Sequence, residues 1–243
     1  MIFDASVLRQ NKNSEIERMD IDKNEVFVVI PGYNEEKRVG PVIRSVLSKG
    51  YRNIIFVDDG SKDDSRRIAK DAGATVLRHD INMGKGVAAK TGCDYALKKG
   101  AKIICLMDAD GQHKAEDLEK LVKKINETRA DIVFGYRPLN REMPAVMKFG
   151  NWFISTATQV LQGIKLKDTQ SGFRCFTAQA YKKIRWSAQD YSMESEMIAN
   201  VAKNRLRFAE EKIDTVYLDR FKGTTVLDGI KIVINILKYK LLK

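Results

Sequence analysis

Three short apolar runs, each closed by turn-forming residues, constrain the fold of this chain most strongly. They cover residues 26–30, 54–57 and 103–107, and a helical pattern follows each of them. Continuous apolar runs of this length are typical of strands buried in a parallel sheet, and their alternation with helices indicates successive βα units. We therefore predict an α/β fold with a doubly wound, mostly parallel sheet, helices on both faces and a mixed second half.

The order of predicted elements supports one main domain over residues 25–226. Strands are predicted at residues 26–31, 53–58, 74–78, 101–107, 131–135 and around 207–219. Helices are predicted at residues 35–48, 64–72, 86–98, 115–127, 145–161, 177–183 and 193–204. No linker or repeat interrupts this part, so residues 1–24 are predicted to be an extension and residues 227–243 a C-terminal amphipathic helix.

Two carboxylates one residue apart follow the third apolar run. A buried parallel strand would deliver Asp108 and Asp110 to the carboxyl edge of the sheet, where open α/β folds bind ligands. Oxygen ligands suit Mg²⁺ or Mn²⁺, and an ion held by one or two carboxylates keeps positions open for substrate phosphates. We therefore predict a divalent metal and a diphosphate here. The alternative is a helix N-cap followed by acidic first-turn residues, because aspartate is also a favoured cap.

The loops after the first two runs are predicted to join this site. Tyr33 can stack on a base, and Asp59 can accept hydrogen bonds from base N–H groups. Gly60 and Ser61 allow a tight turn and capping of the next helix. The alternative reading of Asp59 and Ser61 is turn and cap chemistry alone, but the three motifs occur in the order that successive βα units require.

Seven sequence blocks carry a resemblance to a known family. They are IPGYNE at 30–35, VDDGS at 57–61, NMGKG at 82–86, DADGQH at 108–113, GYR at 135–137, DTQSGFR at 168–174 and RFKGTT at 220–225. In these blocks, and from about Val26 to about Gly229, the chain resembles the inverting family 2 glycosyltransferases, most closely the dolichyl-phosphate mannose and glucose synthase group. The resemblance implies a Rossmann-like, GT-A type fold. It also implies transfer of a hexose from GDP-mannose, UDP-glucose or UDP-GlcNAc to dolichyl or polyprenyl phosphate, with inversion.

The same resemblance assigns roles to individual residues. Nucleotide binding is expected of Pro31, Tyr33, Glu35, Val57, Asp59, Asp108, Ala109, Arg137 and Arg220. Binding of Mg²⁺ or Mn²⁺ is expected of Asp108, Asp110 and Gln112, and a direct part in catalysis is expected of Asp110, Arg137 and Arg220. One departure concerns the sugar. Val226 stands where mannose synthases tend to carry a lysine, so the resemblance implies the reaction without fixing the hexose.

The residues themselves leave the acceptor open. A sugar hydroxyl needs a general base, for which Glu194 and Glu196 are candidates, although both can equally cap or decorate the following helix. A phosphate acceptor is already an anionic nucleophile, and cations would hold it. The residues assigned to the acceptor or the sugar are Lys85, Ser171, Arg174, Glu194, Glu196 and Lys222. The alternative function is therefore an inverting transferase that acts on a glycan or polysaccharide hydroxyl.

Three other classes of protein fit the sequence less well. A sugar nucleotidyltransferase would open with a glycine-rich triphosphate loop, and residues 31–34 do not form one. A nicotinamide enzyme would carry a Gly-x-Gly-x-x-Gly motif after its first strand, which is absent. The net charge of +11 would allow a nucleic-acid binder, but the lysines are spread widely and no known module is present. No nucleic-acid partner is therefore expected.

The distribution of charge at the C-terminus predicts contact with a membrane surface. On a helix, Asp228, Lys231, Asn235 and Lys238 would form one narrow polar stripe on an otherwise apolar cylinder. Such a helix either packs on the domain or lies in a membrane interface, and residues 144–154 are a second candidate. No segment reaches the roughly 18 apolar residues of a membrane span, and residues 1–24 lack a signal-peptide core. We therefore predict a cytoplasmic protein, peripheral on the cytoplasmic face of the membrane.

The cysteines predict a reducing compartment. The chain has 3 cysteines, an odd number, and none of them forms a Cys-x-x-Cys pair. Neither a disulfide nor a zinc site is expected from this spacing.

Overall fold

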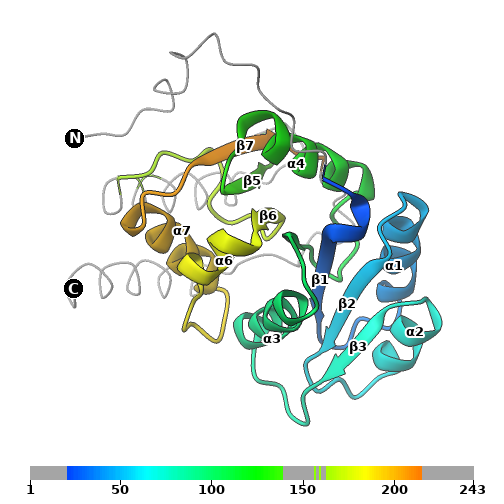
Figure 1. Ribbon diagram of the computed structural model, residues 1–243. Coiled ribbons are helices and arrows are strands. Elements are labelled where there is room, and N and C mark those ends of the chain that lie inside the picture. Colours follow the sequence, from blue (N-terminus) through cyan, green and yellow to red (C-terminus); the bar gives the residue numbers. More distant parts are fainter. Residues whose placement is uncertain (1–20, 139–155, 157–158, 160–162, 215–243) are drawn as a thin grey trace.

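The computed structural model describes residues 21–138, 156, 159 and 163–214 (Figure 1). Its strands are β1 (Val26–Gly32), β2 (Asn53–Asp58), β3 (Thr75–Arg78), β4 (Ile103–Leu106), β5 (Ile132–Tyr136), β6 (Arg174–Thr177) and β7 (Phe208–Lys212). Its helices are α1 (Val39–Ser48), α2 (Ser65–Asp71), α3 (Lys85–Lys98), α4 (Ala115–Thr128), α6 (Ala178–Ile184) and α7 (Met193–Lys203), with a short 3-10 helix η2 (Lys23–Glu25) before β1.

The described strands form one mixed sheet of seven in the order β3-β2-β1-β4-β6-β5-β7. The pairs β1–β2, β1–β4, β2–β3 and β5–β7 are parallel. Strand β6 lies between β4 and β5 and is antiparallel to both. The predicted α/β class, with a mostly parallel first half and a mixed second half, is confirmed.

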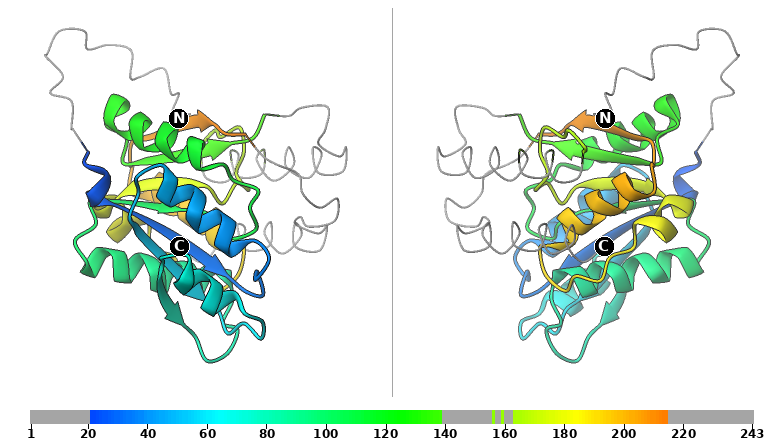
Figure 2. Two further views of the ribbon diagram at one scale, coloured as in Figure 1. Left: turned by 90° about the vertical axis from the view of Figure 1, so that its right-hand side faces the viewer. Right: turned by 90° about the vertical axis from the view of Figure 1, so that its left-hand side faces the viewer.

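Helices cover both faces of the sheet (Figure 2). Helices α1 and α4 contribute to one apolar cluster, and α3, α6 and α7 contribute to the other. Helix α1 shows why it packs as it does, because its buried Val39, Val42, Ile43 and Val46 repeat at i, i+3, i+4 and i+7. The strands between the two layers are nearly continuous in apolar side chains because both of their faces are buried.

The sheet topology brings six loops to one edge. The carboxyl ends of the parallel strands β1, β2, β3, β4 and β5 all point to this edge. Because β6 runs the other way, its amino end lies there too, together with residues 168–173 that precede it. The loop before α7 is attached to the start of α3, since Gly86 N–H donates to the Gln189 carbonyl at 2.7 Å and Trp186 Nε1 donates to the Gly86 carbonyl at 2.8 Å.

The structure confirms most of the elements predicted from periodicity and corrects some boundaries. The first helix begins at Val39 and not at residue 35, because Asn34 has a left-handed backbone and the Glu35 carbonyl accepts a turn bond from Arg38 N–H. Strand β6 was not predicted, since its four residues run directly into α6, which Thr177 caps. The predicted helix at 145–161, the predicted extension at 1–24 and the predicted C-terminal helix lie largely or wholly outside the described residues.

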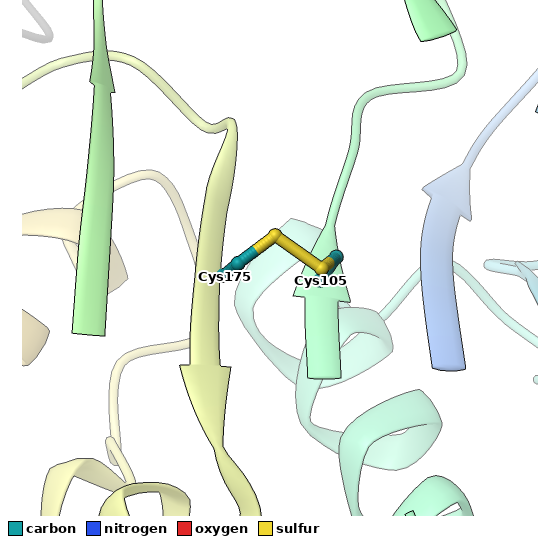
Figure 3. The surroundings of a disulfide bond; sticks show 2 residues. All are labelled: Cys105 and Cys175. Atoms are coloured by element: carbon teal, nitrogen blue, oxygen red, sulfur yellow. A yellow bond between two sulfur atoms is a disulfide. The ribbon is translucent and has the colours of Figure 1, made fainter. Parts of the chain in front are cut away.

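The prediction about cysteines was wrong. Cys105 in β4 and Cys175 in β6 face each other in the antiparallel register, and a disulfide joins them (Figure 3). The sequence hides this pair because the two residues are 70 positions apart and β6 is too short to recognise. Cys93 is a free, buried thiol whose pKa burial raises. Cysteine usage therefore gives no support for a reducing compartment.

Candidate active site

The turn after β4 presents two carboxylates at the shared sheet edge. Asp108 N–H donates to Nδ1 of His113 at 3.3 Å, and the His113 ring stacks on Phe173 with centroids 4.8 Å apart. Asp110 Oδ1 accepts a hydrogen bond from Gln112 N–H at 3.0 Å. The turn is thus fixed by its own backbone and by a buried histidine. Both aspartates stay partly exposed, as a ligand site at a strand end requires.

A lysine from another element balances the first of these carboxylates. Lys85 Nζ, at the start of α3, lies 2.8 Å from Asp108 Oδ1 and 3.1 Å from Glu194 Oε1 in the first turn of α7. Burial alone would raise the pKa of Asp108, but the charge of Lys85 lowers it to about 2. The two carboxylates in turn raise the pKa of Lys85 against the effect of its burial. Asp108, Lys85 and Glu194 therefore form a charged chain that joins the turn after β4 to the first turns of α3 and α7.

Asp110 has no such partner among the described residues. Burial and the neighbouring charge of Asp108 raise the pKa of Asp110, and no described cation lies within ion-pair distance of it. A divalent cation at this point would compensate both aspartates, and two carboxylate oxygen donors fit Mg²⁺ or Mn²⁺. No group of three or more histidine, cysteine or acidic side chains among the described residues is arranged for a metal. The two-carboxylate set fits an ion that completes its coordination with water and phosphate oxygens.

Close packing of the loop before β6 holds the Asp108–Lys85 pair in place. A Cβ built on Gly172 would lie 2.8 Å from Asp108 Oδ2 and 3.0 Å from Lys85 Nζ. Any larger residue at this position would therefore force the side-chain ends of Asp108 and Lys85 to shift. Ser171, beside it, is buried, and its carbonyl accepts from the guanidinium of Arg174 at 3.0 Å.

Two arginines near the site have different surroundings. Arg137 follows β5 and makes a two-point contact with the buried Asp168, from Nε at 2.7 Å and from Nη2 at 3.2 Å. Burial would raise the pKa of Asp168, but the charge of Arg137 lowers it. Arg174 is fully buried, and its guanidinium donates to the carbonyls of Ser171, Glu194 and Thr169 at 2.8 to 3.0 Å. These contacts favour a structural role for Arg174 over the predicted contact with phosphate.

The loops after β1 and β2 are tied together on the other side of the site. Asn34 N–H donates to Ser61 Oγ at 3.0 Å, and Glu35 N–H donates to Ser65 Oγ at 2.7 Å. Ser61 therefore links two loops. It does not cap α2, so the cap predicted from the sequence was wrong. Tyr33 lies between these bonds and the end of β1 and is 41% exposed, so a ligand can reach its side chain.

The other residues predicted to bind the nucleotide lie deeper. Pro31 and Val57 pair in the register of β1 and β2 and are buried, so only their backbone can border a ligand. Ala109 is also buried. Glu35 makes an ion pair with Arg38 at 3.2 Å. Nucleotide binding by Glu35 stays a prediction.

The two candidate bases differ sharply. Glu196 Oε2 accepts from the backbone N–H groups of Ser187 and Ala188 at 2.9 and 2.8 Å, so Glu196 organises the loop before α7. Glu194 contacts Lys85 through Oε1, while its buried Oε2 has no hydrogen-bond partner among the described residues. Both side chains are buried and neither decorates an exposed helix face.

The structure thus brings together most of the predicted site residues. Arg220 and Lys222 lie outside the described residues, and their roles stay predictions. Sequence reasoning gave no separate role to His113, Asp168 or His79. The first two stand inside matching blocks, which was the available signal, whereas His79 follows β3 without any motif.

Comparisons with known proteins identify the family of this chain. A family model described as Glycosyl transferase family 2 matches residues 27–185, more than half of the chain. The chain belongs to family 2 of the glycosyltransferases and is an enzyme of that class, as its sequence blocks predicted.

Relatives cover nearly the whole chain. An uncharacterized protein of Methanocaldococcus jannaschii is 38% identical over 96% of this chain and 99% of its own length. A UDP-N-acetylglucosamine–dolichyl-phosphate N-acetylglucosaminyltransferase of Methanococcus voltae is 34% identical over 89% of this chain and 96% of its own. An undecaprenyl-phosphate mannosyltransferase of Micrococcus luteus is 27% identical over 84% of this chain and 88% of its own.

A solved structure confirms the GT-A type fold. Glucosyl-3-phosphoglycerate synthase from Mycobacterium tuberculosis, in complex with Mg²⁺ and UDP, superposes with a TM-score of 0.71 at 20% identity. The match covers 88% of this chain and 78% of that one. At this level of identity the likeness establishes the fold alone.

Proposed function

We propose that this enzyme transfers a hexose from a nucleotide-diphosphate sugar to dolichyl or polyprenyl phosphate, with inversion and with Mg²⁺ or Mn²⁺ as cofactor. The names of the relatives from Methanococcus voltae and Micrococcus luteus support a polyprenyl-type phosphate acceptor. A likeness to a synthase that binds Mg²⁺ and UDP supports the metal and the nucleotide donor.

In this proposal the donor lies across the loops at the sheet edge. The base stacks on Tyr33 and contacts Asp59, and the diphosphate lies near Asp108, Asp110 and Arg137. The bound metal would supply positive charge that stabilises the departing diphosphate. Asp108 and Asp110 would hold this ion, while the Asp168 contact keeps the Arg137 guanidinium in a fixed direction. Arginine in a fixed orientation suits two-point contact with phosphate oxygens.

The observation that carries the phosphate acceptor is the state of the two glutamates. Glu196 accepts hydrogen bonds from two backbone N–H groups, and Lys85 balances the charge of Glu194. A neutral hydroxyl would need one of them to remove its proton, whereas a phosphate monoester attacks as an anion. Its oxygen forms the new bond to C1 of the sugar as the bond from C1 to the diphosphate oxygen breaks. The nucleoside diphosphate leaves with the electron pair.

One observation favours the alternative, an acceptor that attacks through a hydroxyl. Glu194 Oε2 is buried and has no hydrogen-bond partner in the part of the chain that the structure describes, so this oxygen could accept a proton. A Glu194→Gln variant separates the two functions because glutamine keeps the shape and removes the base. With a phosphate acceptor we expect less than about ten-fold loss of transfer, whereas loss of a general base costs on the order of a hundred-fold or more.

The matched variant is Glu196→Gln, which weakens the hold on Ser187 and Ala188 without touching Lys85. It should lower the melting temperature more than Glu194→Gln does. A loss of transfer of a hundred-fold or more in Glu194→Gln, with a normal melting temperature, would favour the hydroxyl acceptor.

We also propose that the enzyme docks on the cytoplasmic face of a membrane. No helix among the described residues is long and apolar enough to cross a bilayer. The predicted C-terminal helix and residues 144–154, the sequence-based candidates for docking, lie outside those residues. Removal of residues 232–243 should reduce transfer to long polyprenyl phosphates more than transfer to a short soluble analogue. Equal loss with both acceptors, together with a lower melting temperature, would instead place this helix in the core.

A further inference from the structure

The loop between α6 and α7, residues 185–192, lies against the first turn of α3 (Figure 1). Trp186 Nε1 donates to the Gly86 carbonyl at 2.8 Å, and Gly86 N–H donates to the Gln189 carbonyl at 2.7 Å. Trp186 is 2% exposed, so its hydrogen bond is shielded from water. One loop therefore holds Gly86 of α3 both by its carbonyl and by its N–H group.

The two backbones approach each other too closely for a side chain to fit between them. A Cβ on Gly86 would lie 2.4 Å from the Ala188 carbonyl oxygen, and a Cβ on Gly84 would lie 2.4 Å from the Gln189 carbonyl oxygen. Both atoms belong to the backbone, which cannot turn aside as the end of a flexible side chain can. The contact therefore fixes the first turn of α3 relative to the loop.

The loop is itself anchored to the helices on either side of it. Glu196 Oε2, in α7, accepts from Ser187 and Ala188 N–H at 2.9 and 2.8 Å. The ring of Trp186 packs edge-on against Tyr181 of α6, with centroids 5.9 Å apart. The position of α6 and α7 is thus passed on, through this loop, to the start of α3.

Lys85 stands between the two glycines that touch the loop. Its side chain is 19% exposed, and its Nζ lies 2.8 Å from Asp108 Oδ1 and 3.1 Å from Glu194 Oε1. The ring centroid of Tyr191, at the end of the same loop, lies 5.3 Å from Nζ. Lysine has a flexible four-carbon stem, and ordering this stem costs rotamer entropy. A fixed backbone at Lys85 leaves fewer conformations to be given up when both ion pairs form.

We infer that Trp186 is a positioning residue, which holds the start of α3 so that Lys85 stays in contact with Asp108. The inference rests on the proposed function, in which Asp108 holds the metal beside the diphosphate. Trp186 acts through Gly86 and Lys85 and lies outside the sequence blocks that indicate the family.

Two substitutions weaken the contact in different ways. Trp186→Phe keeps an aromatic ring in the core and removes the N–H group that Gly86 accepts. Gly86→Ala adds a methyl group that would lie 2.4 Å from the Ala188 carbonyl oxygen. Alanine favours a helix more than glycine does, so helix propensity alone predicts that Gly86→Ala is harmless. The contact with the loop predicts that it is disruptive.

The matched control is Tyr181→Phe. The Tyr181 hydroxyl donates to Asp94 Oδ1 at 2.7 Å, so this variant also removes a hydrogen bond between an aromatic side chain of the same cluster and α3. Asp94 lies farther along the helix, beyond the turn that carries Lys85. Tyr181→Phe should therefore leave Lys85 in place.

The position of Lys85 can be measured without the reaction. The full chain is treated with acetic anhydride in the absence of substrate and metal, and mass spectrometry compares the labelling of Lys85 with that of the exposed Lys98. In Trp186→Phe and Gly86→Ala this ratio should rise at least about five-fold, because local opening exposes an amine that two ion pairs had shielded. In Tyr181→Phe it should keep the wild-type value. An unchanged ratio in both variants, or an equal rise in the control, would overturn the inference.

The rate of sugar transfer is the second measurement. At saturating donor it should fall at least about ten-fold in Trp186→Phe and Gly86→Ala and less than about two-fold in Tyr181→Phe, because a small misplacement near the reacting groups is costly. Normal transfer by a variant whose Lys85 is freely labelled would contradict the positioning role. If Trp186→Phe fails to fold, Gly86→Ala, which leaves every core side chain unchanged, decides the question.

Failure of this inference is distinct from failure of the proposed function. A wild-type enzyme that forms no lipid-linked product, while the variants show the expected labelling of Lys85, would contradict the proposed function and leave the hold of Trp186 on Lys85 intact. Lipid-linked product formed at the wild-type rate by both variants would contradict the inference alone.

Discussion

Asp108 and Asp110 are chemically identical and separated by one residue, yet their surroundings shift their pKa values in opposite directions. The charge of Lys85 lowers the pKa of Asp108, whereas burial and the charge of Asp108 raise the pKa of Asp110. The difference comes from α3, which places Lys85 beside one carboxylate only. At the residue scale, Asp108 is thus part of the protein's own charge network, and Asp110 is the carboxylate left for an added cation.

This asymmetry predicts different effects of two similar substitutions. Asp110→Asn should reduce transfer on the order of a hundred-fold or more, because it removes a proposed metal ligand. The melting temperature should stay within about 2 °C, because Asp110 forms no ion pair with a described residue. Asp108→Asn should lower both the rate of transfer and the melting temperature, because it leaves Lys85 with Glu194 as its one carboxylate partner among the described residues. Wild-type transfer by Asp110→Asn, or in excess chelator, would contradict the metal site.

Gly172 provides a second prediction at this scale. In Gly172→Ala the new methyl group would lie 2.8 Å from Asp108 Oδ2 and 3.0 Å from Lys85 Nζ, so the ion pair must shift. We expect at least about ten-fold loss of transfer, because a small misplacement of a catalytic group is costly. Steady-state kinetics with a circular dichroism spectrum as the fold control would check it. Unchanged kinetics would mean that this contact does not position the site.

At the scale of elements, the antiparallel strand β6 organises the second half of the site. It brings residues 168–173 to the same edge as Asp108, and the disulfide between Cys105 and Cys175 ties it to β4. Asp168, in the preceding loop, orients Arg137 from β5. The positions of a candidate catalytic arginine and of Gly172 therefore depend on one strand of four residues.

The Arg137–Asp168 pair predicts a pH-dependent contribution to stability. Because the folded pKa of Asp168 lies below its ordinary value of 3.8, the pair stabilises the fold above that pH and is lost as the pH falls through the folded pKa. Asp168→Asn should cost about 2 kcal/mol in the free energy of unfolding at pH 7. Urea denaturation should show this difference shrinking below about pH 4, where Asp168 of the unfolded chain becomes protonated, and vanishing once the pH falls below the lowered pKa of the folded state. A difference that stays constant down to pH 2 would be inconsistent with the pair.

The disulfide predicts a thiol count. Protein purified without reductant and unfolded in guanidinium should show one reactive thiol, from Cys93, and 3 after reduction. Reduction should lower the melting temperature. A cross-link over a loop of 70 residues removes conformational entropy from the unfolded chain and so raises its free energy by about 4 kcal/mol. Three thiols before reduction would show that Cys105 and Cys175 are not joined.

At the scale of the whole molecule, the predictable parts of the fold are those set by local pattern. Strands β1, β2 and β4 are buried on both faces, so their apolar runs and closing turns mark them, and Asp108 and Asp110 follow directly. Arg174 and Glu196 were not predictable in the same way. Each looks like a ligand-binding residue in sequence, but backbone groups of other segments, brought near only by folding, already occupy it.

The central claim is that this enzyme loads a hexose onto a polyprenyl phosphate with the help of a divalent metal. The most direct test incubates the enzyme with radiolabelled UDP- and GDP-sugars, Mg²⁺ or Mn²⁺, and either polyprenyl phosphate or the matching polyprenol, and then counts the label in the organic phase. We predict lipid-extractable label only with the phosphate, and its disappearance in excess chelator. Equal labelling of polyprenol, labelling that persists without metal, or transfer to a soluble glycan alone would contradict the account.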